Sequence, residues 1–272
     1  MVYRPNCKLN IGLRVIRKRE DGYHDLDTVF YPVYGLYDEL DVNKADSLSF
    51  EQDGITVDCN PEDNLILRCY RLMAAHYPKI GGVRIRFKKN IPFGAGLGGG
   101  SSDAAHMAIA LNDLFNLGLT KAELAKEVRV LGADCPFFIY NCPCHAEGIG
   151  DILTPIHFSL AGLRLVMIKP DIAVSTKEAY AGLTPTGTLL PDITQWKSYI
   201  NDFETTVFKL HPELGHIKQR LIDAGAVYAS MTGSGSTIYG LFENNTERAS
   251  LINLRCFEEE FASMIIFNDT LC

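Results

Sequence analysis

The sequence predicts an α+β protein of two lobes, and three observations support this prediction. Strand-like segments with alternating apolar and polar residues interleave with helix-like segments along the whole chain. With 272 residues, the chain is long enough for one large domain or for two. A continuous apolar strand restarts the pattern at residues 163–168, so we favour two lobes, residues 1–158 and 159–272.

Composition argues against several classes of protein. Hydrophobic residues make up 47% and charged residues 22% of the chain, which are ordinary values for a globular protein. The net charge of −7 argues against a nucleic-acid partner, because such proteins carry a basic surface. The N-terminus lacks a signal-peptide core, and no apolar run is long enough to cross a bilayer. The eight cysteines are scattered, so we expect reduced thiols and a cytoplasmic protein with no membrane partner.

The first element is a strand at residues 7–16, which carries Lys8 and Asn10 on one face. From this segment alone, a solvated strand charge is the simpler interpretation of Lys8. The Asp21-Gly22 pair then predicts a turn, and Tyr23 and His24 follow directly after it. Binding residues often stand at such a position, although a plain hairpin is equally consistent with the pattern.

Further strands with turns between them are predicted over residues 27–37 and 41–56. Residues 61–64, PEDN, are typical of a helix start and precede an apolar helix at residues 65–76. Residues 83–87, VRIRF, alternate apolar and charged side chains and predict a strand with one face in water.

A glycine-rich stretch follows at residues 92–105, PFGAGLGGGSSDAA. A buried helix is predicted over residues 104–114, with Ser101, Ser102 and Asp103 as N-cap candidates. A glycine loop that leads into a helix N-terminus offers backbone amides and the positive end of a helix dipole. The stretch therefore predicts a phosphate site.

Other glycine loops fit this stretch less well. A Walker A loop needs a lysine where this chain has Gly100. The dinucleotide pattern Gly94-x-Gly96-x-x-Gly99 is present, but the strand before it alternates instead of being buried throughout. A flexible linker is disfavoured because a strand and a buried helix flank the stretch directly.

The next helix is predicted at residues 123–131, opened by the capping box Thr120-x-x-Glu123. Asp134 then stands between a helix stop and a proline, where it can be an N-cap or a positioned functional acid; both interpretations stay open. Residues 146–151 predict a turn between strands. Cys142-x-Cys144-His145 lacks the spacing of a structural zinc site, and His106 is interpreted as a core histidine.

In the second lobe, a capping box at residues 175–178 opens a short helix that carries Tyr180. Helices are predicted at residues 195–210 and 212–224, and two strands at residues 227–231 and 237–242 flank the loop TGSGS, residues 232–236. A helix near residues 246–255 and a strand near residues 263–267 complete the chain.

Four separate pieces suit phosphoryl transfer: Lys8 with Asn10, the glycine loop, Asp134 and the loop 232–236. The reaction needs donors around a triphosphate, a cation, and a carboxylate that positions or deprotonates the attacking hydroxyl. Their spacing along the chain does not show that they meet in space.

Residues 92–105 resemble the second motif of the GHMP small-molecule kinases, and residues 232–235 resemble the third. Four further segments are KLN at 8–10, DGYH at 21–24, EDNLI at 62–66 and LGADCP at 131–136. Together with residues 146–155, they resemble the members that phosphorylate 4-diphosphocytidyl-2-C-methylerythritol in the non-mevalonate isoprenoid pathway. The resemblance implies a two-lobed GHMP kinase fold, with a ribosomal-protein-like N-terminal lobe and a ferredoxin-like C-terminal lobe.

The resemblance also implies roles for individual residues. Lys8 and Asp134 match the catalytic pair: Asp134 as general base on the 2-hydroxyl of the acceptor, and Lys8 as the cation that keeps it ionised. ATP is the implied phosphate donor and Mg²⁺ the implied metal, for which no ligands are assigned. The implied ATP-binding residues are Lys89, Pro92, Gly94, Gly96, Leu97, Gly98, Gly99, Gly100, Ser101 and Ser102.

On the acceptor side, Tyr23 matches a residue that stacks on the cytosine and His24 one that hydrogen-bonds to it. Tyr180 matches an aromatic residue on the opposite face of the base, although residues 171–177 depart from the family pattern. The other implied contacts, to the erythritol and phosphates, are Asn10, Asn64 and Thr176.

Two alternatives remain. The first is a GHMP kinase for another alcohol, such as homoserine or mevalonate, but DGYH at residues 21–24 argues against it because those substrates carry no cytidine. The second is a catalytically inactive relative that binds a nucleotide, and the presence of both Lys8 and Asp134 argues against it.

Overall fold

The computed structural model describes residues 1–56, 60–244 and 255–271. The helix expected near residues 246–255 lies almost wholly outside the described residues. The chain groups into two compact units whose segments interleave. Unit 1 comprises residues 1–8, 32–93 and 98–142, and unit 2 comprises residues 9–31, 94–97 and 143–272. The division into lobes at residue 158 stays a prediction.

Unit 1 contains a four-stranded sheet in the order β1-β4-β6-β5. Its strands are β1 (Val2–Tyr3), β4 (Glu39–Lys44), β5 (Ser49–Gly54) and β6 (Val83–Lys89). Along β6 the side chains alternate between buried and exposed, which confirms the predicted half-buried strand. β6 runs antiparallel to β4 and parallel to β5.

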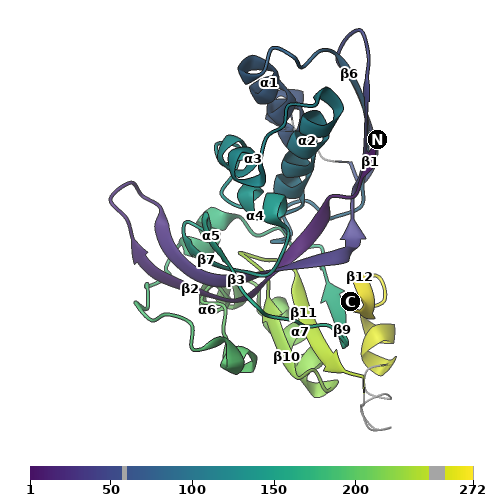
Figure 1. Ribbon diagram of the computed structural model, residues 1–272. Coiled ribbons are helices and arrows are strands. Elements are labelled where there is room, and N and C mark those ends of the chain that lie inside the picture. The colour runs from purple at the N-terminus through teal and green to yellow at the C-terminus, as the bar shows by residue number, and fades with distance from the viewer. Residues whose placement is uncertain (57–59, 245–254, 272) are drawn as a thin grey trace. The chain divides into compact units, whose positions relative to one another are not determined.

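The helices of unit 1 follow the 3-10 turn η1 (Pro61–Asp63); they are α1 (Leu65–His76), α2 (Gly99–Phe115), α3 (Lys121–Val128) and α4 (Cys135–Tyr140). Helices α1 and α2 pack side by side, and α2 also packs on β4 (Figure 1). Asn64 caps α1 by accepting hydrogen bonds from the amides of Ile66 and Leu67. The predicted capping box of Thr120 and Glu123 is confirmed at the start of α3.

The predicted start of the buried helix was wrong. Helix α2 begins at Gly99, and its N-cap is Gly98 in the left-handed conformation, not Ser101, Ser102 or Asp103. A Cβ on Gly99 would lie 2.9 Å from Cγ2 of Ile91, so only glycine lets the first turn lie this close to its neighbour. N-cap preference alone could not reveal this packing.

Unit 2 contains a four-stranded antiparallel sheet in the order β10-β11-β9-β12. Its strands are β9 (Leu163–Ile168), β10 (Tyr228–Met231), β11 (Ile238–Glu243) and β12 (Ile265–Thr270). The first three confirm the predicted strands. The helices are α5 (Thr176–Tyr180), which begins with the predicted capping box, α6 (Glu204–Leu210) and α7 (Pro212–Asp223).

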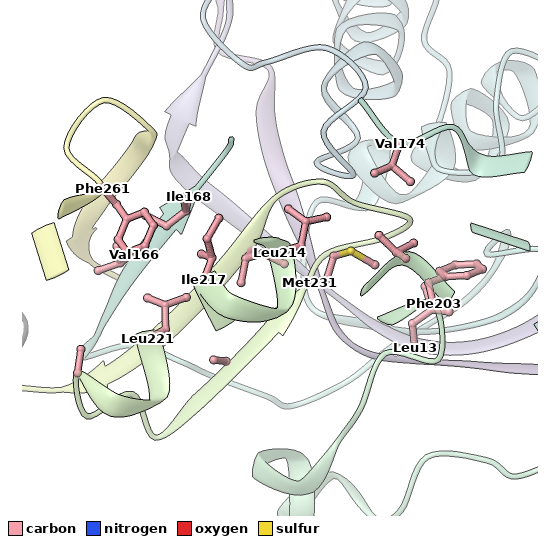
Figure 2. Close-up of a cluster of buried hydrophobic side chains, with 14 of the residues drawn as sticks. Leu13, Val166, Ile168, Val174, Phe203, Leu214, Ile217, Leu221, Met231 and Phe261 are labelled. Atoms are coloured by element: carbon pink, nitrogen blue, oxygen red, sulfur yellow. The ribbon is translucent and has the colours of Figure 1, made fainter. Parts of the chain in front are cut away.

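A cluster of buried apolar side chains joins this sheet to the helices (Figure 2). Val166 and Ile168 from β9 and Met231 from β10 pack with Phe203 and with Leu221 of α7. All five side chains are at most 3% exposed. This core fixes the end of β10, which leads directly into the loop 232–236.

The single helix predicted at residues 195–210 is wrong. The chain forms the 3-10 helix η2 (Ile193–Ser198), then an extended stretch, then α6. In the stretch, the carbonyl of Ile200 accepts from the amide of Leu13, and the amide of Asp202 donates to the carbonyl of Leu13. Pairing with a distant strand therefore overrides the local preference for helix.

The third sheet has the order β2-β3-β7-β8. Its strands are β2 (Asn6–Lys18), β3 (His24–Tyr37), β7 (Cys144–Gly148) and β8 (Ile152–Pro155). The turn predicted at residues 146–151 connects β7 to β8 and is confirmed. Within the described part of the chain, no helix has the length and apolar character needed to cross a membrane.

Candidate active site

Lys8 and Asp134, which are 126 positions apart in the sequence, lie beside each other in unit 1. Lys8 extends from β2 and its side chain is only 4% exposed, whereas Asp134 lies just before α4 and is 31% exposed. The distance between Lys8 Nζ and Asp134 Oδ2 is 3.6 Å. Asp134 occupies the N-cap position of α4, but its carboxylate makes no capping hydrogen bond. This geometry favours the positioned acid over the N-cap.

The electrostatics of the pair are set mainly by the burial of Lys8. Burial lowers the pKa of Lys8, and the nearby carboxylate of Asp134 opposes that shift only in part. A buried ammonium of this kind is poorly hydrated, so it interacts strongly with any negative charge that develops nearby. The more exposed Asp134 is the member of the pair that a substrate can approach.

The glycine loop alternates between two backbone conformations. Gly94, Gly96 and Gly98 have φ angles of 62°, 76° and 71°, a region that favours glycine. A Cβ on Gly98 would lie 3.2 Å from Cε of Lys8 and 3.0 Å from the ring of Phe138. The end of the loop therefore lies directly against the catalytic candidate Lys8.

The N-terminus of α2 continues the loop. The amides of the first turn of a helix have no intrahelical partner and carry the positive end of the dipole. In this helix they belong to residues 98–101, and the first intrahelical bond runs from the amide of Ser102 to the carbonyl of Gly98. Leu97 is buried, and Pro92 is half-buried, so Leu97 can offer a ligand only its backbone. The arrangement suits an anion.

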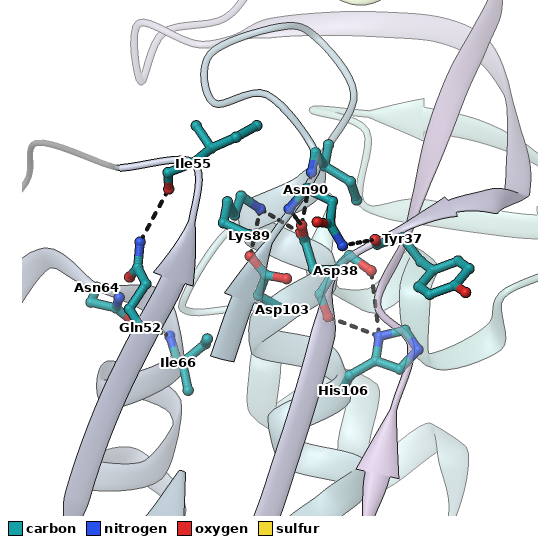
Figure 3. A network of polar contacts seen from close by, with 12 residues as sticks. Tyr37, Asp38, Gln52, Ile55, Asn64, Ile66, Lys89, Asn90, Asp103 and His106 are labelled. Carbon is teal, nitrogen blue, oxygen red and sulfur yellow. Dashed lines mark hydrogen bonds and ion pairs between the residues drawn. The ribbon is translucent and has the colours of Figure 1, made fainter. Parts of the chain in front are cut away.

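Lys89 lies beneath this first turn and is almost fully buried (Figure 3). Its Nζ lies 2.6 Å from Asp38 Oδ2 and 2.8 Å from Asp103 Oδ2. Although burial alone would lower the pKa of Lys89, the carboxylates of Asp103 and Asp38 outweigh it and raise that pKa. A Cβ on Gly99 would lie 3.1 Å from the ammonium, so Lys89 supports the loop from below.

Asp38 and Asp103 were not predicted as part of the site. Asp38 also accepts hydrogen bonds from the amides of Asn90 and Ile91 (Figure 3). Burial raises the pKa of Asp103 well above its usual value, against the opposing ammonium of Lys89. No pattern in the sequence marks Asp38. Asp103 was noted only as an N-cap candidate, because the spacing that brings both carboxylates to Lys89 exists only in the fold.

A cavity of about 130 Å³ adjoins this network within unit 1. Its lining residues are Gln52, Asp63, Asn64, Leu65, Ile66, Phe87, Lys89, Phe93, Gly100 and Asp103. The walls are mostly apolar, and Gly100 of the glycine loop contributes to them. Asn64, predicted as a substrate contact, lines this cavity while its side-chain oxygen caps α1.

In unit 2, the loop 232–236 packs against the first part of the glycine loop. The hydroxyl of Thr232 accepts from the amide of Asn10 at 3.0 Å and donates to the carbonyl of Gly96 at 3.2 Å. The side-chain amide of Asn10 donates to Thr28, and Asn10 is buried. Three of the four pieces predicted for phosphoryl transfer therefore include residues that touch one another in this unit.

The aromatic residues predicted to hold a base also lie in unit 2. His24 stacks directly on Tyr180, with ring centroids 4.3 Å apart and planes 17° apart. The stack occupies one face of the Tyr180 ring, which also meets the ring of Phe203 edge-on at 4.8 Å. Tyr23 is 61% exposed, and Thr176 lies 3.4 Å from the hydroxyl of Ser234. Burial, together with the charge of Lys18, lowers the pKa of His24.

Two histidines are accounted for by structural contacts. His106 is buried in α2, with its Nδ1 2.9 Å from the carbonyl oxygen of Ser102, which confirms the predicted core histidine. His145 lies 2.5 Å from the carboxylate of Asp27. Within residues 1–56, 60–244 and 255–271, no group of three His, Cys, Asp or Glu side chains is arranged to hold a metal ion.

Comparison with known proteins identifies the group to which this geometry corresponds. Residues 64–142 match the GHMP kinases N terminal domain, and residues 188–254 match the GHMP kinases C terminal domain. A Bacteroides thetaiotaomicron protein named 4-diphosphocytidyl-2-C-methyl-D-erythritol kinase is 48% identical over 255 residues, covering 89% of this chain and 92% of its own length. A protein of the same name from Azobacteroides pseudotrichonymphae is 45% identical over 252 residues, covering 89% and 94%.

Comparison with solved structures agrees with the matches in sequence. The crystal structure of a 4-(cytidine 5'-diphospho)-2C-methyl-D-erythritol kinase matches with a TM-score of 0.84 and 33% identity, covering 100% of this chain and 99% of its own. Homoserine kinase from Cytophaga hutchinsonii matches with a TM-score of 0.71 at 17% identity, covering 99% and 94%, which supports the fold alone. The predicted α+β fold class is confirmed.

Proposed function

The chain belongs to the 4-diphosphocytidyl-2-C-methyl-D-erythritol kinases of the GHMP kinase family, and we propose that Lys8 and Asp134 form its catalytic pair. It is a small-molecule kinase that transfers phosphate from ATP to the cytidylated alcohol of the isoprenoid pathway. The observation that carries the catalytic assignment is the ion pair of a buried lysine with a more exposed aspartate, next to a glycine loop.

In the proposed reaction, Asp134 accepts the proton of the 2-hydroxyl of the acceptor. The freed oxygen attacks the γ-phosphorus of ATP while the bond to the leaving ADP breaks. Lys8 stabilises the negative charge that develops on the attacking oxygen, because its ammonium is preorganised and poorly hydrated. At a separation of 3.6 Å, the ammonium of Lys8 can also orient the carboxylate of Asp134 by charge attraction.

The phosphates of ATP are proposed to lie on the amides of residues 94–102. Positive φ angles at Gly94, Gly96 and Gly98 and the N-terminus of α2 support this, since backbone amides there are open to an anion. Lys89 contributes from beneath, as a support held by two carboxylates, not as a direct phosphate ligand. Mg²⁺ is expected to arrive with ATP, held mainly by phosphate oxygens, as is usual for this ion.

The cavity beside Gly100 suits the base of ATP. Its apolar walls include Leu65, Ile66 and Phe87, and Phe93 at its edge is 67% exposed. A flat heteroaromatic ring gains from stacking and from apolar burial in such a site. This pocket was not predicted, because its walls come from four separate segments of the chain.

On the acceptor side, we assign the cytosine to Tyr23 and His24, with a changed role for Tyr180. The lowered pKa keeps the His24 ring neutral near pH 7, so it can both donate and accept a hydrogen bond. The direct stack of Tyr180 on His24 suggests that Tyr180 orients the histidine instead of covering the second face of the base. Thr176, beside Ser234, remains a proposed contact to the acceptor phosphates.

The substrate assignment is tested by measuring ADP release with ATP, Mg²⁺ and either the cytidylated or the plain methylerythritol substrate. We expect turnover with the cytidylated substrate and a loss of at least about 10²-fold in kcat/KM without the cytidyl group, because its binding energy is then missing. Tyr23→Ala should reduce the ratio of kcat/KM for the cytidylated substrate to kcat/KM for the plain alcohol. Equal activity on both alcohols, or activity only on homoserine or mevalonate, would refute the cytidine assignment.

The charge state of Lys8 predicts the alkaline limb of the pH profile. Because burial lowers its pKa, kcat/KM should fall as Lys8 loses its proton, at a lower pH than an ordinary lysine would titrate. Lys8→Arg should move this limb to higher pH, whatever its remaining activity, because a guanidinium stays protonated. Phosphorylated product is measured directly, so that coupling enzymes do not limit the pH range.

Lys169→Arg serves as the control for this experiment. Burial also lowers the pKa of Lys169, whose ammonium donates to the carbonyls of Pro170 and Ile172 in unit 2. In the Lys169→Arg variant, the alkaline limb of the pH profile should stay at the wild-type pH. An unchanged limb in Lys8→Arg would assign the titration to another group.

A further inference from the structure

A buried asparagine within the matched C-terminal domain, Asn201, holds the loop 232–236 in place. Asn201 lies in the extended stretch before α6 and is 2% exposed. Its side-chain Nδ2 donates to the carbonyl of Met231 and to the carbonyl of Gly233, both at 2.8 Å. Its Oδ1 accepts from the amide of Phe203 at 3.0 Å. One side chain therefore binds the backbone on both sides of Thr232.

The residues around Asn201 are buried and joined by backbone hydrogen bonds. Leu13, Phe203 and Met231 all belong to the buried apolar cluster of unit 2 (Figure 2). Leu13 forms a parallel bridge with Asn201 through the backbone. From the next turn, Glu204 accepts from the amide of Met231 at 2.8 Å. The end of β10 is thus bound through its N–H by Glu204 and through its carbonyl by Asn201.

The loop 232–236, which Asn201 holds, is in direct contact with the glycine loop. A Cβ on Gly96 would lie 2.1 Å from the carbonyl oxygen of Thr232, which shows how closely the two backbones approach. The hydroxyl of Thr232 donates to the carbonyl of Gly96, and the amide of Thr237 reaches the carbonyl of Ala95 at 3.4 Å. A shift of the loop 232–236 would therefore move Gly96.

We propose that Asn201 is a positioning residue for ATP: its amide fixes the carbonyls of Met231 and Gly233, and Thr232 between them fixes Gly96 of the phosphate loop. This inference rests on the proposed role of residues 94–102. Asn201 touches no reacting atom. It acts by keeping backbone donors at the spacing that the phosphates require, where small displacements are costly.

The test is Asn201→Asp, which keeps the size of the side chain but replaces its two N–H donors by an oxygen that repels both carbonyls. We expect KM for ATP to rise at least about tenfold, since buried carbonyls lose their partners and the loop shifts. KM for the cytidylated alcohol should stay within about twofold, because uniform loss of ATP binding does not affect the other substrate.

A merely structural role would give a different result. It would lower the melting temperature and the active fraction, and so the measured kcat, while both KM values stayed at wild type. That outcome would overturn the proposal. If Asn201→Asp does not fold, Asn201→Ala, which adds no charge, and Thr232→Val, which removes the hydroxyl bridge to Gly96, measure the same connection.

Asn112→Asp is the matched control. In α2, the Asn112 side chain binds the amide and the carbonyl of Leu119 in the same way, but it lies away from the phosphate loop at the other end of the helix. It should lower stability without raising KM for ATP. Binding of a fluorescent ATP analogue is measured in parallel: wild type that binds it but turns over no alcohol would refute the proposed reaction and leave Asn201 to be judged by affinity.

Discussion

Replacing Asp134 by asparagine is expected to lower kcat by about 10²- to 10⁴-fold, the range found when a general base is removed. Asparagine keeps the shape of the side chain but cannot accept the proton of the attacking hydroxyl. KM for ATP should change little, because Asp134 makes none of the proposed phosphate contacts. Single-turnover measurements of product formation separate this loss from slow product release.

The buried charge of Lys8 requires a control for folding in this experiment. In the Asp134→Asn variant, the ammonium of Lys8 stays buried, at 4% exposure, but loses its paired carboxylate. The variant is therefore expected to lose folding stability as well as activity. Asp113→Asn removes a more distant carboxylate of unit 1, one that accepts from the hydroxyl of Tyr3. It should retain near-normal kcat. An Asp134→Asn protein that is folded and keeps a tenth or more of the wild-type kcat would exclude Asp134 as the base, since it falls short of the ~10²-fold expected.

The second large effect is expected from Gly96→Ala. The added Cβ would come within 2.1 Å of the carbonyl oxygen of Thr232, and the φ of 76° is unfavourable for any residue with a Cβ. The loop must therefore move away from residues 232–236, and its amides lose their alignment with the phosphates. We expect kcat/KM for ATP to fall by at least about 10²-fold.

Gly94→Ala separates the effect of backbone strain from the effect of the collision with Thr232. Gly94 has a similar φ of 62°, but nothing lies within 4 Å of the position where its Cβ would be. This variant therefore carries the backbone strain, about 1–2 kcal/mol, without the collision. If both variants lose ATP affinity equally, strain alone explains the result, and the close approach of Gly96 to Thr232 has no functional importance. Titration with ATP, followed by kinetics and by melting temperature, distinguishes these outcomes.

Elements governed by local chemistry were predictable. The alternation along β6, the capping boxes at Thr120 and Ser175, and helix α1 behind its Asn64 cap all appear as expected. Each depends on contacts between residues at most a few positions apart, so a short window contains the whole cause. The glycine loop also predicted a phosphate site, because its composition alone implies accessible backbone amides.

The predictions that were wrong concern elements that depend on contacts between distant residues. Residues 195–210 favour a helix locally, but pairing with Leu13 breaks it. Helix α2 begins early because Gly99 packs closely on Ile91, and Lys89 is a buried support because Asp38 and Asp103 reach it from other segments. In each case the deciding partner lies eight or more positions away, so a local sequence pattern does not reveal it.

The candidate site divides in the same way. Residue types were enough to select Lys8, Asp134 and the glycine loop, since a cation, a carboxylate and open amides are what phosphoryl transfer needs. Only the fold shows that Lys8 is buried and lies 3.6 Å from Asp134, that His24 stacks on Tyr180, and that Asn201 holds the loop beside Gly96. Those facts depend on long-range packing and desolvation, which a linear pattern of side chains does not encode in readable form.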